Sequence, residues 1–153
     1  MSAKQEVVIT GVGVASPLGF GLEEFRAALA DRQSVLAPLT IVDTTYLAMP
    51  FGAELKDFEP KEYVTPRKSL KVMSRDIQTA YAASVIAMND ASLEKGSVTP
   101  ERLGVVFGSD MIYSPASELE QVFRKCIEDG EYQHDRWGEA AMSNIYPLWM
   151  LKY

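Results

Sequence analysis

An alanine-rich helix is the feature that most constrains how this chain can fold. The sequence predicts it from about Ser74 to Ser92. Large apolar side chains recur on one face at i, i+4, i+8 and i+11, namely Ile77, Tyr81, Val85 and Met88. Five alanines between positions 80 and 91 keep the rest of the cylinder narrow. Other segments can therefore pack closely on several sides, and we expect this helix in an interior.

Two runs rich in β-branched residues predict strands buried on both faces. They are VVITGVGV at residues 7–14 and LGVVFG at residues 103–108. We also expect helices from Leu22 to Ala30 and from about Pro115 to Asp129, the second ending at Gly130, and a short strand over residues 51–55. Strands that alternate with helices favour an α/β fold with a largely parallel sheet.

Composition excludes several classes of function. A chain of 153 residues fits one domain or one lobe of a larger domain. The net charge of −6 argues against general affinity for nucleic acid, because neutralising phosphates requires a basic surface. The single cysteine, Cys126, permits no intrachain disulfide. No signal-peptide pattern and no apolar run long enough to span a bilayer are present, so we expect a soluble, cytoplasmic protein.

The glycine-rich run at residues 11–16, GVGVAS, begins like a dinucleotide-binding loop. Its third glycine is replaced by Ser16, Pro17 follows directly, and Asp31 is expected at the end of a helix and not of a strand. We therefore predict no cofactor, and expect the glycines to allow close packing of the backbone at the centre of a sheet. Cys126 lies on the apolar stripe of a predicted helix and is interpreted as structural. The only histidine, His134, lies in a polar stretch typical of solvated loops.

One stretch of this acidic chain is strongly basic. Arg67, Lys68, Lys71 and Arg75 fall within nine residues that contain no acid. In a helix, the spacing i, i+4 and i+8 would place Arg67, Lys71 and Arg75 on one face, with Lys68 beside them. Such a patch suits docking of an acidic macromolecule, but a solvated helix face would have the same pattern. The charges alone leave both interpretations open.

Five segments, taken in their order and spacing, resemble the β-ketoacyl-[acyl-carrier-protein] synthases of the elongating type. They are VVITGVGVASPLG at 7–19, FGAELKDFEP at 51–60, RKSLKVMSRDIQTAYAASVIAMNDA at 67–91, RLGVVFGSD at 102–110 and SNIYPLWMLKY at the end. The resemblance implies a thiolase-like fold, in which two similar α/β halves form a layered αβαβα core, and a homodimer. It also implies Claisen condensation of an acyl group, held on a cysteine, with malonyl carrier protein.

The same resemblance places the catalytic cysteine and the two histidines beyond Tyr153. Residues 1–153 are then the amino-terminal half of the fold, truncated before the catalytic cysteine, and we expect this chain by itself to be inactive. The residues from Asn144 to Tyr153 are predicted to form an apolar helix with Pro147 in its first turn. Two other interpretations stay open: a chain-length-factor-like, non-catalytic partner subunit, and a free-standing interaction module.

Some functional positions of the family carry over by resemblance. Lys68 and Lys71 match basic positions that contact the acidic acyl carrier protein, and Arg67 lies beside them. Met111 matches the position that gates the acyl-chain pocket, a role that suits a flexible thioether. The chain departs from the family at Val72, where another basic residue is frequent, and at Asp110, where a small residue is usual.

Overall fold

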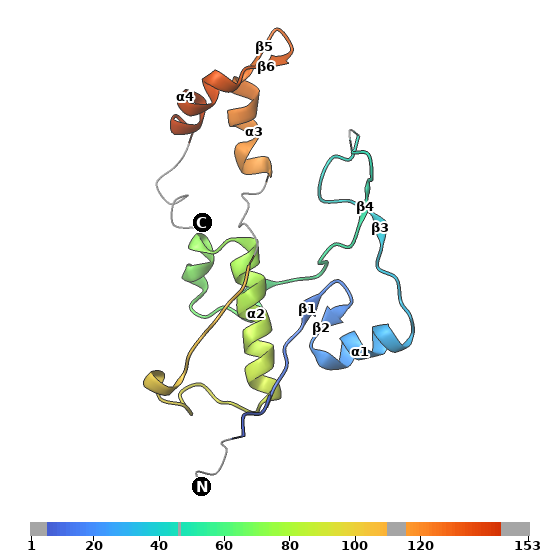
Figure 1. Cartoon of the computed structure of the whole chain (residues 1–153), viewed down its shortest axis with the longest axis vertical. Coiled ribbons are helices and arrows are strands. Elements are labelled where there is room, and N and C mark those ends of the chain that lie inside the picture. The colour runs from blue at the N-terminus through green and yellow to red at the C-terminus, as the bar shows by residue number, and fades with distance from the viewer. Residues whose placement is uncertain (1–5, 46, 110–115, 145–153) are drawn as a thin grey trace.

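The computed structural model describes residues 6–45, 47–109 and 116–144. Figure 1 shows the α-helices of these residues: α1 (Leu22–Ala30), α2 (Arg75–Asp90), α3 (Ala116–Lys125) and α4 (Trp137–Met142). The 3₁₀ helices are η1 (Pro60–Glu62), η2 (Arg67–Val72), η3 (Pro100–Arg102) and η4 (His134–Arg136). Three antiparallel strand pairs of two residues each complete this part: β1 (Ala15–Ser16) with β2 (Gly19–Phe20), β3 (Ala37–Pro38) with β4 (Phe51–Gly52), and β5 (Ile127–Glu128) with β6 (Glu131–Tyr132).

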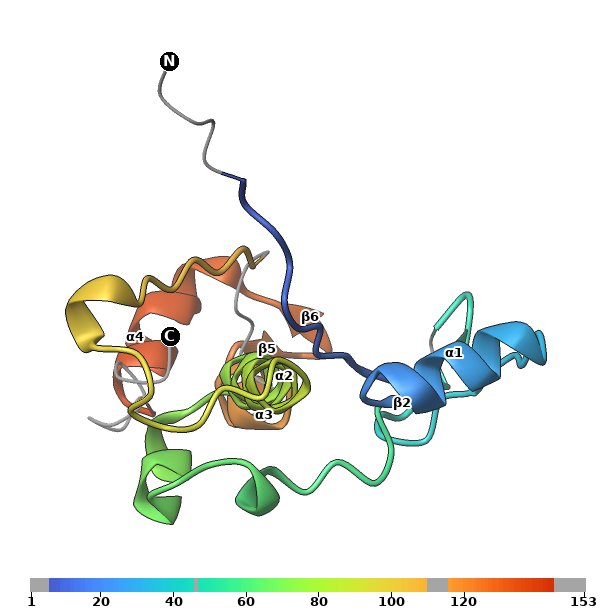
Figure 2. The same ribbon diagram turned by 90° about the horizontal axis from the view of Figure 1, so that it is seen from below.

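Helix α2 confirms the strongest prediction from the sequence. The hydroxyl of the buried Ser74 caps it, accepting a hydrogen bond from the amide of Ile77 at 3.4 Å. The alanine side of the helix is the side that packs closely, and Ala82 is completely buried. Tyr81, on the predicted apolar face, is 40% exposed. Figure 2 shows α2 nearly end-on. The expected interior position is not reached in the described residues, because Ala82 is the one buried residue of this helix.

Residues 11–13 pack directly on α2. A Cβ on Gly11 would lie 2.6 Å from the amide nitrogen of Ala91, and one on Gly13 would lie 2.6 Å from that of Ala87. Between the two glycines, the amide of Val12 donates to the Asp90 carboxylate at 2.8 Å. The glycines thus allow close backbone packing, as predicted, but against a helix and not at the centre of a sheet.

The two predicted buried strands are not strands in the structure. Residues 6–14 and 103–108 run as open segments, and Val7 and Val106 are 92% and 98% exposed. The predicted parallel sheet is likewise missing from the described ranges, where every strand pair is antiparallel. A β-branched run favours extended backbone, but it forms a strand only when a neighbouring strand accepts and donates its hydrogen bonds. No described segment takes that place.

The remaining predictions hold in part. The helix from Leu22 to Ala30 is confirmed, and Asp31 follows its last residue. The predicted strand over 51–55 is shortened to Phe51–Gly52. The helix expected to reach Asp129 ends at Lys125, since residues 127–132 form the β5–β6 hairpin instead. Its turn residues, Asp129 and Gly130, both have positive φ, 51° and 83°. The predicted helix over 144–153 lies almost wholly outside the described residues.

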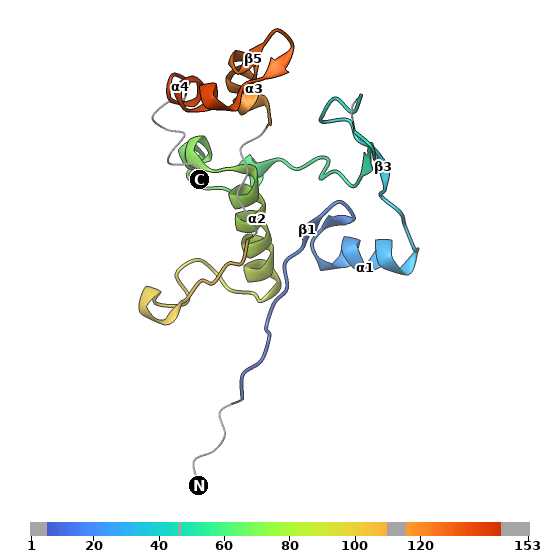
Figure 3. The ribbon, with the colours of Figure 1, turned by 45° about the horizontal axis from the view of Figure 1, so that its top comes forward.

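Helices α3 and α4 and the hairpin between them form a small unit with its own core, at the top of the tilted view in Figure 3. Val122, Cys126 and Ala140 are buried together, with Trp137 packed against them. The ring of Phe123 lies 4.8 Å from that of Trp137. Cys126 has no exposed surface, so its predicted structural role is confirmed by its burial.

The packing of the glycine segment on α2 makes a direct prediction. Gly13→Ala should lower the free energy of unfolding by about 1–3 kcal/mol, because the new methyl group overlaps the backbone of α2. Gly104→Ala is the matched control, since a Cβ there meets nothing within 4 Å. Urea unfolding followed by circular dichroism measures both variants. Equal stability of Gly13→Ala and the parent would show that residues 11–13 do not pack on α2.

Candidate functional site

An aromatic stack holds the segment that precedes the basic cluster. The buried ring of Phe58 lies between the rings of Phe20 and Tyr63, at centroid distances of 5.9 and 6.1 Å. The guanidinium of Arg75 lies over the Phe58 ring, 4.8 Å from its centroid, and donates to the carbonyl of Leu55 at 3.1 Å. The stack therefore ties the β1–β2 hairpin to η1 and to the first turn of α2.

The short helix η1 continues this rigid region toward the cations. The amides of Tyr63 and Val64 both donate to the carbonyl of Pro60, at 3.2 and 2.9 Å, and the Val64 side chain is buried. Burial raises the pKa of the Tyr63 hydroxyl above its ordinary value, and the carboxylates of Glu62 and Glu24 raise it further. Tyr63 therefore stays neutral at physiological pH.

The basic cluster, which we define as Arg67, Lys68 and Lys71, lies on η2. All three residues are exposed, while Leu70 and Val72 are partly buried on the same short helix. A 3₁₀ helix has three residues per turn, so Lys68 and Lys71 project along the same line with Arg67 next to them. Within the described residues, none of the three forms an ion pair.

Arg75 does not belong to this cluster. A continuous α-helix would have aligned Arg67, Lys71 and Arg75, but η2 ends at Val72 and α2 starts anew after Ser74. The guanidinium of Arg75 instead lies over the Phe58 ring and donates to the Leu55 carbonyl. The four cations that the sequence groups together thus divide into three available charges and one that stabilises the fold.

The other candidate residues have clear positions. His134 is exposed in η4, with its ring 6.3 Å from that of Tyr132. Met111 and Asp110 lie outside the described residues. In the ranges that the structure covers, no helix combines the length and apolar character needed to cross a bilayer. The only cysteine, Cys126, is fully buried, so its thiol is not exposed to a substrate.

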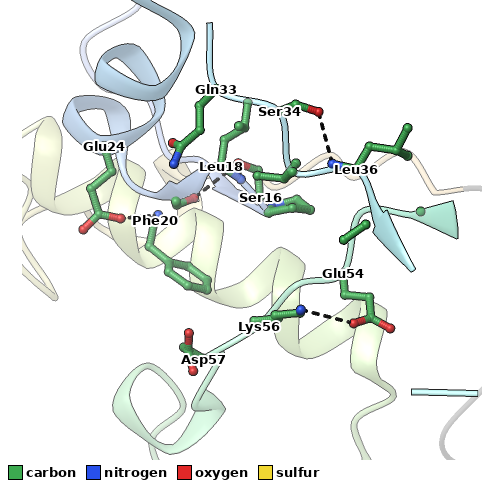
Figure 4. A pocket seen from close by; sticks show the side chains of 15 residues that line it. Ser16, Leu18, Phe20, Glu24, Gln33, Ser34, Leu36, Glu54, Lys56 and Asp57 are labelled. Carbon is green, nitrogen blue, oxygen red and sulfur yellow. Dashed lines mark hydrogen bonds and ion pairs between the residues drawn. The ribbon is translucent and has the colours of Figure 1, made fainter. Parts of the chain in front are cut away.

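A polar cleft that the sequence did not predict lies between the β1–β2 hairpin, α1 and the β3–β4 pair (Figure 4). Its volume is about 630 Å³. Its lining includes Ser16, Glu24, Gln33, Glu54 and Lys56. The Glu24 carboxylate accepts from the amide of Phe20 at 2.8 Å, and the Ser16 hydroxyl accepts from the amide of Leu18 at 3.2 Å. Much of its polar surface is thus already engaged in local hydrogen bonds.

Glu54 holds together the two ends of the loop between β3 and β4. Its carboxylate accepts from the amide of Thr40 at 2.5 Å, from the Thr40 hydroxyl at 2.7 Å and from the amide of Ile41 at 2.9 Å. These bonds, with a minor contribution from Lys56 at 3.7 Å, lower the pKa of Glu54 from 4.5 to about 2. The Glu54 side chain is only 5% exposed, so it works as a clamp and not as an acid or base.

This clamp predicts a pH dependence with a definite sign. The pKa of Glu54 is lower in the folded chain than in the unfolded chain. The carboxylate therefore stabilises the β3–β4 loop fully above pH 4.5, and this stabilisation is lost as pH falls toward 2. Nuclear magnetic resonance of the Thr40 and Ile41 amides should report this opening. Glu54→Gln should abolish the transition, because the charge is absent at every pH. The control is Glu94→Gln, at an exposed turn, which should leave the transition of the Thr40 and Ile41 amides unchanged. If Glu54→Gln also left that transition unchanged, Glu54 would not be the group that titrates.

The chain is similar to known proteins of one family. Residues 4–146 match the model of the β-ketoacyl synthase amino-terminal domain. The chain is 34% identical over 106 residues to 3-oxoacyl-[acyl-carrier-protein] synthase 2 of Synechocystis sp., which covers 69% of this chain and 25% of that protein. It is 31% identical over 145 residues to a polyketide β-ketoacyl synthase 2 candidate of Streptomyces halstedii, covering 92% of this chain and 35% of the relative.

A solved structure agrees with these relatives. The ishigamide ketosynthase/chain length factor superposes with a TM-score of 0.66 and 30% sequence identity, over 95% of this chain and 33% of that one. The fold is therefore that of the amino-terminal domain of a ketosynthase. The chain belongs to the β-ketoacyl synthase family and corresponds to its amino-terminal portion. It spans about a quarter to a third of the length of these relatives.

Proposed function

We propose that this chain is the amino-terminal part of a 3-oxoacyl-[acyl-carrier-protein] synthase, in which the basic cluster on η2 docks the acyl carrier protein. The whole enzyme would condense an acyl thioester with malonyl carrier protein in fatty-acid or polyketide synthesis. The observation that carries the proposal is the exposure of three cations on one short helix of an acidic member of this family, with no ion pair to any of them among the described residues.

The physical setting favours an acidic partner. Like charges on one short helix repel each other, and an approaching acidic surface relieves that repulsion. The aromatic stack holds η1, and the amide of Ser69 donates to the Pro66 carbonyl at 3.0 Å at the start of η2. Binding therefore needs little ordering of the backbone beneath the lysines, which keeps its entropic cost low.

The chemistry of condensation would come from residues that this chain does not contain. The only cysteine, Cys126, is fully buried in the core of α3 and α4, so it cannot reach a thioester. The only histidine, His134, is exposed, with its ring beside that of Tyr132. We assign to this chain the recruitment of carrier protein, within the amino-terminal half of a thiolase-like αβαβα fold that assembles as a homodimer.

A second candidate function is that of a chain-length-factor-like, non-catalytic partner subunit. It is favoured by one observation, the likeness to a solved ketosynthase/chain length factor. The two functions differ at the position that carries the catalytic cysteine in a ketosynthase, which lies beyond Tyr153 in the resemblance. A cysteine at that position in the parent protein supports the synthase, and another residue supports the partner subunit.

Docking can be tested by reversing charge. Lys68→Glu combined with Lys71→Glu should weaken binding of an acidic acyl carrier protein by up to about tenfold, because exposed ion pairs contribute about 0.2–1 kcal/mol each. The loss should be largest at low salt, where steering is strongest. Surface plasmon resonance at several salt concentrations measures the effect.

The control for docking is Lys95→Glu combined with Arg102→Glu, which makes the same change in net charge at exposed residues after α2. This pair should bind the carrier protein almost as well as the parent. Equal weakening by both pairs would mean that net charge alone governs binding. Unchanged binding by the Lys68 and Lys71 variant would mean that the cluster is only solvated.

The chain alone should carry out no condensation. Incubated with acyl and malonyl carrier proteins, it should form no 3-ketoacyl product above background in an assay by mass spectrometry, while an intact 3-oxoacyl-[acyl-carrier-protein] synthase 2 forms it readily. Cys126→Ala should behave like the parent. A product that disappears in Cys126→Ala would contradict the structural assignment of this cysteine.

A further inference from the structure

Ser69 lies at the centre of the basic cluster. It is the third residue of η2, with Arg67 and Lys68 directly before it and Lys71 two residues after it. No other serine or threonine of the chain has a cation both two residues before it and two residues after it. The three cations of the cluster therefore surround one hydroxyl group.

The hydroxyl of Ser69 is not used by the fold. In the described part of the chain it makes no hydrogen bond, whereas the hydroxyls of Ser74, Thr79 and Ser84 all bond to the backbone of α2. Ser69 is partly buried, but no buried side-chain oxygen of the described residues lacks a partner. The Ser69 oxygen must therefore reach solvent. A group can be added to it without breaking a side-chain hydrogen bond.

The flanking cations favour phosphorylation over other modifications of a hydroxyl. An enzyme that phosphorylates serine recognises the residues around it, and acidic side chains of that enzyme can pair with Arg67 and Lys71. The same cations stabilise the product, because phosphate oxygens accept charge-assisted hydrogen bonds from arginine and lysine. The cluster thus supports both recognition of Ser69 and retention of a phosphate on it.

We propose that Ser69 is a phosphorylation site, and that its phosphate switches off docking of the acyl carrier protein. The Ser69 oxygen attacks the γ-phosphorus of a nucleoside triphosphate, and its proton passes to a base of the kinase. The nucleoside diphosphate leaves with the electron pair of the broken P–O bond. The inference rests on the proposed function, since it names the regulation of that same surface.

A phosphate on Ser69 cancels most of the charge that attracts an acidic partner. It carries about −1.5 to −2 at pH 7, so the charge of the cluster falls from about +3 to about +1. Successive residues of a 3₁₀ helix are about 120° apart, and the flexible side chains of Lys68 and Lys71 can both turn toward the phosphate. Lysines paired in this way are no longer available to the carrier protein, and the phosphate repels its carboxylates.

Phosphorylation of Ser69 is tested on the chain as it is. The chain is incubated with ATP and protein kinase C, a kinase that prefers serine between cations, and the products are mapped by tandem mass spectrometry. We expect phosphate at Ser69. Ser69→Ala should lose this phosphate, and Thr65→Ala, which removes an exposed hydroxyl from the same segment, should keep it. Absence of phosphate at Ser69, or equal phosphorylation of Ser69→Ala, would overturn the proposal.

The effect on docking is measured with phosphoserine encoded at position 69, so that every molecule carries the group. Surface plasmon resonance should show that the acyl carrier protein binds about tenfold more weakly than to the parent at low salt. The matched control has phosphoserine at position 97, where Ser97 is exposed after α2, and gains the same charge outside the cluster. This control should bind almost as well as the parent. Ser69→Ala should also bind like the parent, because docking does not use the hydroxyl.

The remaining outcomes separate the switch from the docking itself. Equal weakening by phosphoserine at positions 69 and 97 would overturn the switch, because net charge alone would then govern binding. Unchanged binding after modification of Ser69, with weaker binding by Lys68→Glu combined with Lys71→Glu, would overturn the switch and leave the proposed function standing. Absence of carrier binding by the unmodified chain would refute docking and the switch together, and the kinase assay would still decide whether Ser69 is a modification site.

Discussion

The close contact between the glycine segment and α2 is the interaction on which the rest of the chain depends. Gly11 and Gly13 bring backbone against the alanine side of the helix, at a separation that no side chain at those two positions allows. Between the two glycines, the amide of Val12 donates to the Asp90 carboxylate at the end of the same helix. From this point the chain is directed into the β1–β2 hairpin, which carries Phe20 to the aromatic stack.

The aromatic stack is the second contact that stabilises the fold. It includes Arg75, whereas the three cations of the basic cluster remain exposed. Arg75 lies over Phe58 and bonds to Leu55, so it helps to hold the start of α2. Arg67, Lys68 and Lys71 lie only a few residues earlier, yet they project from η2 without ion pairs in the described part of the chain. An exposed positive cluster on a protein of net charge −6 is a surface that an acidic partner can recognise, which is why we propose that it docks carrier protein.

The unpaired runs at residues 6–14 and 103–108 and the three small strand pairs reflect the same requirement of a strand for a neighbour. Each segment of strong β-propensity needs a neighbour, and in the described residues the strand pairs are antiparallel pairs of two residues each. Residues 7–10 and 104–108 have no strand neighbour among residues 6–45, 47–109 and 116–144. The partners in a sheet can be distant in sequence, so a β-branched run by itself does not determine whether it pairs.

The sequence by itself determined the local features of this protein. Alanine content and apolar spacing predicted α2, the apolar stripe predicted the burial of Cys126, and the matching segments predicted the family. These properties depend on neighbours within a few residues or on motif order. Three contacts were decided by tertiary structure alone. Gly11 and Gly13 pack on a helix, and Arg75 contacts the Phe58 ring and so does not join the basic cluster. The Glu54 carboxylate accepts hydrogen bonds from Thr40 and Ile41. Each of these depends on groups at least thirteen residues apart, whose approach no local pattern encodes. The predicted sheet failed for the same reason, since a strand is defined by a partner that the chain must bring from elsewhere.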